Sequence, residues 1–314
     1  MVVAKKFQLT FITAVYNGDD YIESTIESVL RFAKDIDFEY IVINDGSTDR
    51  TPDILASFGD KIKVIHQQNK GESASVNVGI ENSQGICSAV ISADDPILTS
   101  KLFENVFEHF DSEPELAAIY PDWQMIDDIG NVIKTIKVPD YSDELLIGRC
   151  RTLPGPGVIF RTSFAQQIGG RRSKWTYVGD YDFWLRLSRV GEIRHRPEVL
   201  AQWRYHANST SVTKRGLKMA NERIAVIEAF LANNVVEDSL GRCALGTSYY
   251  MAARLVFFSN DVPGRKYLLK AFKCRRGWVE EAQLQVIAYI LLLPISRWLL
   301  NPVLSRSKKY RTLI

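Results

Sequence analysis

The chain has 314 residues, of which 46% are hydrophobic and 24% charged, and its net charge is +2. This length and composition are those of a globular protein with a sizeable core, with room for one large α/β domain and a smaller appendage. The four cysteines are far apart and form no Cys-x-x-Cys or Cys/His cluster, which argues against a zinc site or a disulfide framework and for reduced thiols in the cytoplasm. They are Cys87, Cys150, Cys243 and Cys274.

The first hundred residues alternate strand and helix patterns, which is typical of βαβ units and a mainly parallel sheet. Predicted strands cover residues 7–15, 38–43, 61–66 and 86–91, and predicted helices cover 21–33, a short segment from Thr51-Pro52, 73–82 and 101–110. The apolar N-terminal segment is accounted for by the first strand, so we expect no signal peptide. Polar clusters follow the strands, and the carboxyl ends of strands line the ligand crevice of an open α/β sheet.

Beyond these units the pattern changes twice. Residues 115–210 are less regular, with short predicted strands at 117–120, 132–137 and 157–160 and one clear helix at 181–189. From Lys214 onward the sequence is almost continuously compatible with helix. We therefore expect an α/β domain over residues 1–212 and a helical region over residues 213–314.

The C-terminal region ends in a basic, apolar tail. Residues 261–314 contain eleven Lys/Arg against three Asp/Glu, which indicates an anionic surface as partner, phospholipid rather than nucleic acid. Residues 282–296 are uncharged and apolar, but shorter than the roughly 20 residues of a spanning helix. Flanking Trp278 and Trp298 favour an interfacial helix, while a membrane span, a buried helix and a dimer contact stay open.

Two adjacent acids, Asp94 and Asp95, follow the fourth predicted strand and precede Pro96. Neighbouring carboxylates repel each other unless a positive charge lies beside them. Mg²⁺ or Mn²⁺ bound to a diphosphate would supply that charge, because these cations prefer oxygen ligands. Taken alone, the pair also fits the N-cap of a helix, so the metal site is one of two interpretations.

Four other positions have both a functional and a structural interpretation. Asp45, in a Gly-containing turn, can bind a ribose or a base, or it can stabilise its own turn. Tyr16-Asn17 can stack on a base and hydrogen-bond it, or simply pack at the rim of the sheet. Asp180 can be a general base or a helix N-cap, and His206 can be a ligand or a structural histidine.

In this order along the chain, the motifs resemble those of the family 2 glycosyltransferases. They are Thr13-Ala14-Val15-Tyr16-Asn17, Asn44-Asp45-Gly46-Ser47-Thr48-Asp49, Gln68-Asn69-Lys70-Gly71, Asn77-Val78-Gly79, Ala93-Asp94-Asp95 and Gly179-Asp180-Tyr181-Asp182-Phe183-Trp184. The resemblance covers residues 9–189 in full order and continues weakly to residue 211. It implies the GT-A fold, a Rossmann-like mixed α/β sheet flanked by helices, here with a helical C-terminal extension.

The resemblance also implies a role for each matching residue. The nucleotide-sugar site would comprise Thr13, Val15, Tyr16, Asn17, Asp45, Gln68, Asn69 and Asp94, with Tyr16 and Asp45 at the nucleobase and Asp94 at the ribose. Asp95 would bind the divalent metal, with His206 as an additional metal or phosphate contact. Asp180 would be the catalytic base, and Gly179 and Trp184 would lie on the acceptor side.

The implied reaction is an inverting single displacement that uses Mn²⁺ or Mg²⁺ as cofactor. The implied donor is a nucleotide sugar, with UDP favoured and GDP or dTDP open. The acceptor would be a glycan or a lipid-linked glycan in the synthesis of a polysaccharide or cell-surface glycan. We expect transfer of one sugar, at the cytoplasmic face of the cell membrane through the tail, with a homodimer left open and no nucleic acid as partner.

Two positions depart from the family pattern, which often has an acid where Gly179 stands and Asp or Asn where Ser92 stands. The first departure bears on acceptor contacts, and the second changes nothing essential if Asp95 is the ligand. The alternative from another class is a non-catalytic module that binds sugar nucleotides or glycans. Such a module would be expected to lack Asp95 or Asp180, and both are present.

Overall fold

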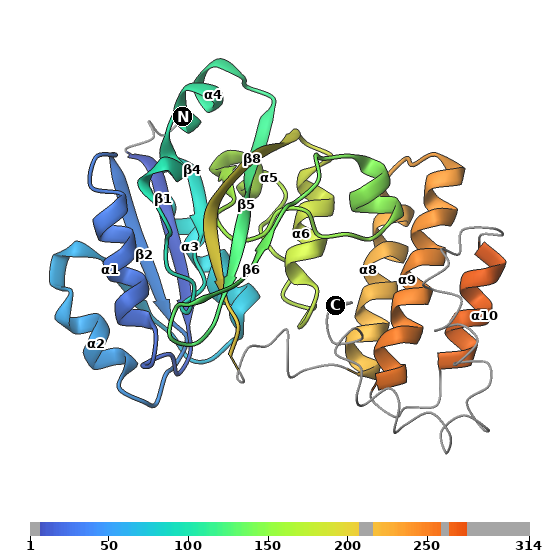
Figure 1. The fold of residues 1–314 in the computed structure, drawn as a ribbon, viewed down its shortest axis with the longest axis horizontal. Helices are drawn as coiled ribbons and strands as arrows, with labels where there is room; N and C mark the ends of the chain where they lie inside the picture. Colours follow the sequence, from blue (N-terminus) through green and yellow to red (C-terminus); the bar gives the residue numbers. More distant parts are fainter. Residues whose placement is uncertain (1–6, 207–215, 259–263, 275–314) are drawn as a thin grey trace. The chain divides into compact units, whose positions relative to one another are not determined.

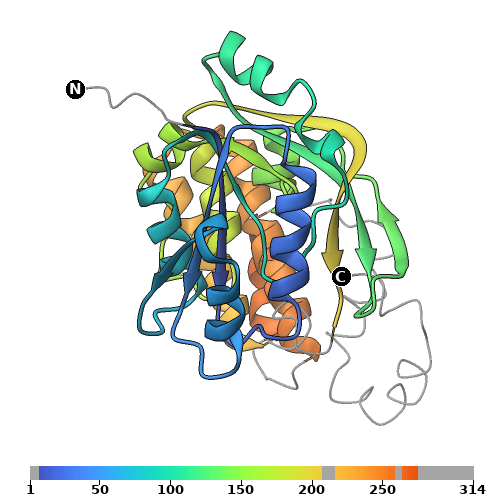
Figure 2. The ribbon, with the colours of Figure 1, turned by 90° about the vertical axis from the view of Figure 1, so that its left-hand side faces the viewer.

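The structure is a computed structural model that describes residues 7–206, 216–258 and 264–274. Contacts divide the chain into two compact units, Met1–Thr213 and Lys214–Ile314, which are considered separately. The first unit contains an eight-stranded mixed sheet with helices on both faces (Figures 1 and 2).

The strand order is β3-β2-β1-β4-β7-β5-β6, with β8 paired to β5. The strands are β1 Phe7–Val15, β2 Phe38–Asn44, β3 Lys63–His66, β4 Gly85–Val90, β5 Leu116–Ile126, β6 Val132–Ile136, β7 Ile159–Arg161 and β8 Glu192–Arg204. The helices of this unit are α1 Ile22–Phe32, α2 Thr51–Ser57, α3 Glu72–Asn82, α4 Val106–Ser112, α5 Thr162–Gln167 and α6 Gly179–Leu187. Strands β1 to β4 pair in parallel, β7 is antiparallel to both of its neighbours, and β8 is parallel to β5.

The core of this unit forms on both faces of β1. Phe11 packs with Ile26 of α1 on one face. On the other face, a Cβ added at Gly79 of α3 would lie 2.2 Å from a methyl carbon of Ile12, so a glycine is required for this close approach. Because both faces are buried, β1 is a nearly continuous apolar run, as expected for a central parallel strand.

One sequence prediction needs correction, and one strand was not predicted. Residues 101–110 were expected to form one helix, but a short 3₁₀ turn at Ser100–Phe103 is separated from α4 by Asn105, whose φ of 59° is left-handed. The sequence also gives no prediction of β8, because Arg194, Arg196 and Pro197 interrupt any apolar alternation. As an edge strand, β8 tolerates a proline that a central strand would exclude.

The second unit consists, over its described residues, of helices α8 Leu217–Asn233, α9 Asp238–Phe258 and α10 Gly264–Cys274. Helix α9 packs against both of the others, with a core that includes Ile224, Ala253 and Leu268. No helix within the described part of the chain is long and apolar enough to span a bilayer. The predicted interfacial segment, and the question of insertion over residues 282–304, lie outside the described residues.

Candidate active site

A cavity of about 580 Å³ opens at the carboxyl ends of β1 and β4, within the first unit. Its walls come from the segments after β1 and β4, the first turns of α3 and α6, residues 154–158 and the end of β8. This volume lies in the usual range for sites that bind small molecules and cofactors. The predicted site residues that line it are Val15, Tyr16, Asn17, Asp94, Asp95, Gly179, Asp180, Trp184 and His206.

The segment after β1 is held by the turn after β2. The amide of Asn17 donates to the Ser47 hydroxyl at 3.0 Å, and its side-chain oxygen accepts from the amide of Thr48 at 2.8 Å. Asn17 has a φ of 51°, which asparagine tolerates better than most residues. These hydrogen bonds fix the segment after β1 and leave Tyr16 52% exposed beside the cavity, so its ring face can stack on a planar ligand.

The buried Asp45 supports a loop instead of lining the cavity. Its two carboxylate oxygens accept from the amides of Lys70 and Gly71, at 2.9 and 2.8 Å, and Oδ1 also accepts from Gln67 Nε2 at 2.7 Å. The structure therefore shows Asp45 joining the end of β2 to the segment before α3. Gln68 and Asn69 lie in that segment and likewise do not line the cavity.

Thr13 is also outside the cavity lining. It is fully buried in β1, and its hydroxyl donates to the carbonyl of Ile91 at 2.8 Å and lies 2.9 Å from the Tyr40 hydroxyl. The structure thus brings together nine of the predicted site residues, whereas Thr13, Asp45, Gln68 and Asn69 are not among the residues that line the cavity. A direct contact of these four with a nucleotide sugar stays a prediction.

One wall of the cavity carries Asp94 and Asp95 and is called the acidic wall here. The end of β8 completes it. Asp95 Oδ1 accepts from the amide of Arg204 at 2.7 Å, and the Asp94 carbonyl accepts from Arg204 Nε at 2.9 Å. His206 Nε2 lies 2.8 Å from Asp94 Oδ2. Residues more than 100 positions apart in the sequence therefore meet around two neighbouring carboxylates.

Burial, and then the charge of Asp94, raise the pKa of Asp95 to about 8, although the Arg204 amide opposes the shift. Asp95 is only 8% exposed, so water cannot stabilise a second negative charge here. A divalent cation would remove this penalty. Carboxylate oxygens suit Mn²⁺ or Mg²⁺, so the acidic pair fits the predicted metal.

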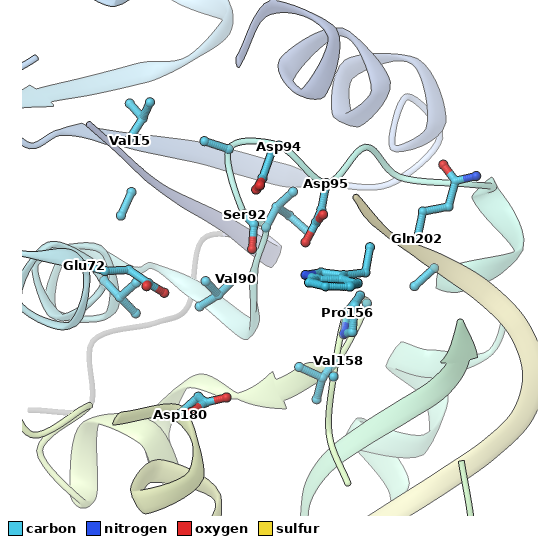
Figure 3. Close-up of a pocket in the computed structure, with 18 of the residues that line it drawn as sticks. Val15, Glu72, Val90, Ser92, Asp94, Asp95, Pro156, Val158, Asp180 and Gln202 are labelled. Atoms are coloured by element: carbon cyan, nitrogen blue, oxygen red, sulfur yellow. The ribbon is translucent and has the colours of Figure 1, made fainter. Parts of the chain in front are cut away.

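The opposite wall is the first turn of α6, from which Asp180 projects on the side facing Asp94 and Asp95 (Figure 3). Asp180 is exposed, and its Oδ1 accepts from the amide of Tyr181 at 2.7 Å. A Cβ at Gly179 would lie 2.7 Å from Ser73 Oγ, so an acid at this position would require the Ser73 side chain to move. Trp184 is buried and packs edge-on against Phe160.

Helix α6 is anchored by a buried ion-pair network. Asp182 accepts from Arg186 Nε at 2.8 Å and from Arg172 at 3.2 Å. The same Arg186 guanidinium donates to the carbonyls of Ile168 and Gly170, at 2.7 and 2.6 Å. This network ties the start of α6 to the loop before it, and so holds Asp180 in place.

Several residues at the cavity had no signal in the sequence. Arg204 and Tyr21 support the acidic wall, with the guanidinium 5.1 Å from the tyrosine ring centroid, and Glu72 and Arg171 form an ion pair at the cavity. Their partners are distant in the sequence, so no local pattern marks them. Trp203 lies beside His206 in a segment that sequence reasoning noted only for its histidine.

A second acidic cluster lies away from this cavity. Glu113, Glu115 and Glu192 have carboxylate oxygens within 4.8 Å of one another. Arg194 pairs with both Glu113 and Glu192, and together with His109 it lowers the pKa of Glu113 to about 2. The cluster is therefore already supplied with positive charge and is a poor candidate for a metal site.

The comparisons with known proteins agree with this geometry. The family model "Glycosyl transferase family 2" matches residues 10–145. An uncharacterized glycosyltransferase of Rickettsia typhi is 30% identical over 277 residues, which cover 83% of each chain. The chain belongs to the family 2 glycosyltransferases. The predicted family and enzyme class are thereby confirmed.

Other relatives are longer than this family 2 glycosyltransferase chain. It spans 44% of an uncharacterized glycosyltransferase of Rickettsia felis, at 26% identity over 82% of its own length. It spans 34% of a chondroitin synthase of Escherichia coli, at 28% identity over 80% of its own length. These matches extend the family relationship across most of the chain.

Solved structures share the fold. S. aureus TarS 1–349 in complex with UDP-GlcNAc has a TM-score of 0.65 at 15% identity, over 84% of this chain and 79% of TarS 1–349. The mannosyltransferase PcManGT of Pyrobaculum calidifontis, in complex with GDP-Man and Mn²⁺, has a TM-score of 0.55 at 12% identity, over 94% of this chain and 88% of PcManGT. The predicted GT-A fold is confirmed.

Proposed function

We propose that this chain transfers a single sugar from a nucleotide-sugar donor to a glycan acceptor by a metal-dependent, inverting displacement. One observation carries the proposal: Asp94 and Asp95 face Asp180 across a single cavity of a size that suits a small-molecule substrate. An acidic pair with one buried member can hold a cation with a diphosphate, and an exposed carboxylate opposite can take a proton from an acceptor.

The donor would bind along the wall formed by the segments after β1 and β4. Tyr16 would stack on the base, Val15 and Asn17 would line its pocket, and Asp94 would accept from the ribose. Asp45 would contact the base, and Thr13, Gln68 and Asn69 would contribute to the same nucleotide-sugar site. UDP is favoured as the nucleotide because TarS was solved with UDP-GlcNAc, and the GDP-Man complex of PcManGT keeps GDP open.

Asp95 and His206 would hold the divalent metal, Mn²⁺ or Mg²⁺. When bound, such a metal neutralises the charge that develops on the departing diphosphate. The chain's own contribution would be the position of the acids. Arg204 holds the carboxylate of Asp95 and the backbone carbonyl of Asp94 through two hydrogen bonds, so little reorganisation is needed when a cation arrives.

Asp180 would accept the proton of the acceptor hydroxyl as that oxygen attacks the anomeric carbon from the face opposite the nucleotide. The new bond joins this oxygen to the anomeric carbon, and the bond between that carbon and the diphosphate oxygen breaks. The configuration at the anomeric carbon is thereby inverted. Gly179 and Trp184, which both line the cavity, would lie on the acceptor side of Asp180.

The product would be a polysaccharide or a cell-surface glycan, which the relationship to a chondroitin synthase supports. We propose a glycan or lipid-linked glycan as acceptor and a peripheral position at the inner face of the cell membrane. The charge and apolar character of the tail support this location. A homodimer that uses the same tail is a second arrangement compatible with its composition.

The replacement Asp180→Asn tests the proposal. Transfer should fall by roughly 10²- to 10⁴-fold, the contribution of a positioned general base, while affinity for the donor nucleotide stays within about twofold. Transfer would be measured with a panel of UDP-, GDP- and dTDP-sugars and Mn²⁺. Asp53→Asn, at an exposed position of α2, is the matched control and should change neither quantity.

Two outcomes would contradict the assignment. A large loss of nucleotide affinity in Asp180→Asn would make Asp180 a binding or structural residue instead of the base. A wild-type protein that binds none of the nucleotides, with or without Mn²⁺, would contradict the donor class itself and favour the glycan-binding alternative.

A further inference from the structure

The charges that line the cavity are unbalanced. Among the lining residues that the structure describes, five are carboxylates and Arg171 is the one arginine or lysine. The carboxylates are those of Asp20, Glu72, Asp94, Asp95 and Asp180. A phosphate or carboxylate of a substrate entering this cavity would be repelled, except at a bound metal and at Arg171.

The backbone of Arg171 is held from two sides. Its amide donates to Asn77 Oδ1 at 2.7 Å and its carbonyl accepts from Asn77 Nδ2 at 2.6 Å, so α3 holds it by both groups. Gly170 has a φ of +63°, and a Cβ there would lie 2.3 Å from Asn77 Oδ1. Arg186 of α6 holds the Gly170 carbonyl at 2.6 Å. The guanidinium is therefore carried by a segment fixed to both α3 and α6.

The ion pair of Arg171 is asymmetric. Its Nη1 lies 2.8 Å from Glu72 Oε1, yet the arginine side chain is 12% exposed and that of Glu72 is 70% exposed. A guanidinium that is largely shielded from water loses more when its counter-ion leaves than an exposed carboxylate loses when it turns to water. Glu72 can therefore give way to another anion at low cost, while Arg171 is more stable with an anion beside it.

This pair lies on the wall that carries Asp180. Glu72 precedes Ser73, whose hydroxyl lies against Gly179, the residue before Asp180. Figure 3 shows Glu72 and Asp180 projecting toward the same space from α3 and α6. An anionic group bound by Arg171 would thus lie inside the cavity and close to the proposed base.

We propose that Arg171 is a substrate-binding residue that exchanges its resting partner, Glu72, for an anionic group of the substrate. The inference rests on the proposed transferase function and adds to it a requirement for negative charge at this wall. Phosphate and carboxylate oxygens both match the planar guanidinium fork. The group comes from one of two sources, the diphosphate of the donor or an acidic substituent on the acceptor sugar.

The experiment compares Arg171→Gln and Glu72→Gln in binding assays on the full chain. Loss of the guanidinium should weaken binding of the anionic ligand by about tenfold or more, since hydrogen bonds to charged groups contribute about 1.5–3 kcal/mol. Loss of the competing carboxylate should instead tighten binding by about threefold. A salt bridge that only supports the fold would move both variants in the same direction.

Two sets of probes distinguish the sources. The first compares a nucleoside diphosphate with its nucleoside, starting with UDP and uridine in the presence of Mn²⁺. The second compares glucuronate and glucose 6-phosphate with glucose, on protein saturated with that nucleotide. Opposite shifts for UDP but not uridine assign the anion to the donor, and opposite shifts only for the acidic sugars assign it to the acceptor.

Arg149→Gln and Glu144→Gln are the matched controls, because this pair, 3.4 Å apart, lies outside the cavity lining. Neither should change any affinity. If Arg171→Gln fails to fold, Glu72→Gln decides alone, with tighter binding of an anionic probe and not of its neutral counterpart as the expected result. Shifts in the same direction, or no shift with any anionic probe, would overturn the inference.

Failure of the proposed function would look different. A wild-type protein that binds UDP, GDP and dTDP equally poorly, with and without Mn²⁺, would contradict the transferase site. The acidic sugars, tested without nucleotide on the same two variants, would then decide whether Arg171 binds an anion.

Discussion

Two aspartates of the first unit, Asp95 and Asp122, are almost equally buried, yet their pKa values are shifted in opposite directions. Asp95 is 8% exposed and Asp122 is 1% exposed. At the end of β4, burial and the neighbouring Asp94 raise the pKa of Asp95 to about 8. In β5, burial acts on Asp122 in the same sense, but hydrogen bonds from Val138 and Lys137 and then His195 outweigh it and lower the pKa.

The surroundings of Asp122 explain its lowered pKa. Its Oδ1 accepts from the Val138 amide at 2.8 Å and lies 3.0 Å from His195 Nε2, and Lys137 Nζ lies 3.0 Å from Oδ2. The His195 ring also stacks on Tyr120, with 5.1 Å between ring centroids. Asp122 thus connects the segment after β6 to strand β5.

The comparison teaches that burial alone does not determine the charge of a carboxylate. Asp122 has hydrogen-bond donors and one lysine beside it within the fold, so its lowered pKa is explained without a ligand. Asp95 has a second carboxylate beside it, and the hydrogen bonds from the Arg204 amide and from Ser92, together with the charge of Arg204, do not offset burial and the charge of Asp94. A buried carboxylate that lacks enough compensating positive charge is suited to bind a cation. Groups in a cavity whose pKa is strongly shifted are candidates for function.

The largest effect should come from Asp95→Asn, which removes the proposed metal ligand. Transfer should fall by at least about 100-fold, in line with the role of the metal in neutralising the leaving diphosphate. Stabilisation of the protein by Mn²⁺ plus nucleotide should disappear, and metal-free stability should not fall, since a disfavoured buried charge is lost. Thermal unfolding with and without Mn²⁺ measures both, and unchanged metal dependence would contradict the assignment of Asp95.

Asp122→Asn should have the reverse profile. Replacing the buried charge removes charged hydrogen bonds to its partners and should lower the free energy of unfolding by about 2–3 kcal/mol. Metal-dependent nucleotide binding should be retained, because Asp122 is not among the residues that line the cavity. Urea unfolding and a nucleotide titration test the pair of expectations. Loss of metal-dependent nucleotide binding without a loss of stability would contradict the proposed difference between the two aspartates.

The two aspartates should also give opposite pH dependence. The folded pKa of Asp122 is lowered, so its stabilisation is present above the unfolded value of about 3.9 and is lost as pH falls through the folded pKa. The folded pKa of Asp95 is raised, so metal-free stability should fall as pH rises from about 4 to about 8.

Urea unfolding between pH 3 and pH 8 measures both slopes against the matching Asn variants. Asp122→Asn should flatten the acidic limb, and Asp95→Asn should flatten the decline toward pH 8. Saturating Mn²⁺ with nucleotide should also remove the decline toward pH 8. If stability without metal falls equally with pH in the wild type and in Asp95→Asn, the raised pKa of Asp95 is not the cause of the decline.

The smallest effect should come from Lys137→Gln. Lys137 contacts the buried Asp122 but is itself 71% exposed, so water screens the ion pair. The variant should lose at most about 1 kcal/mol of stability, the usual limit for an exposed partner. Urea unfolding measures it, and a loss as large as that of Asp122→Asn would mean that Lys137, rather than Val138 and His195, holds the charge.

The strands of the first half could be predicted closely from the sequence. The bounds predicted for the first strand match β1, Phe7–Val15, because the segment is rich in residues that favour strands. Strand β8 could not be predicted, since its residues alternate poorly and its partner β5 lies about 75 residues earlier. Asn105 likewise broke a helix that apolar spacing alone predicted.

The candidate site divides in the same way. The acidic pair and Asp180 were predicted from motifs because each lies at the end of a strand or the start of a helix. Arg204 and Arg171 could not be predicted, because their partners are more than 90 residues away and carry no local pattern.

By itself, the sequence determined the order of strands and helices in the first half, the polar clusters at the strand ends and the family. These follow from periodicity and short motifs, which act over a few neighbouring residues. Only the tertiary structure decided which carboxylate is supplied with positive charge, which one lacks it, and where Arg171 lies. Burial and electrostatic pairing depend on residues that the fold brings together from distant parts of the chain, so no local pattern contains them.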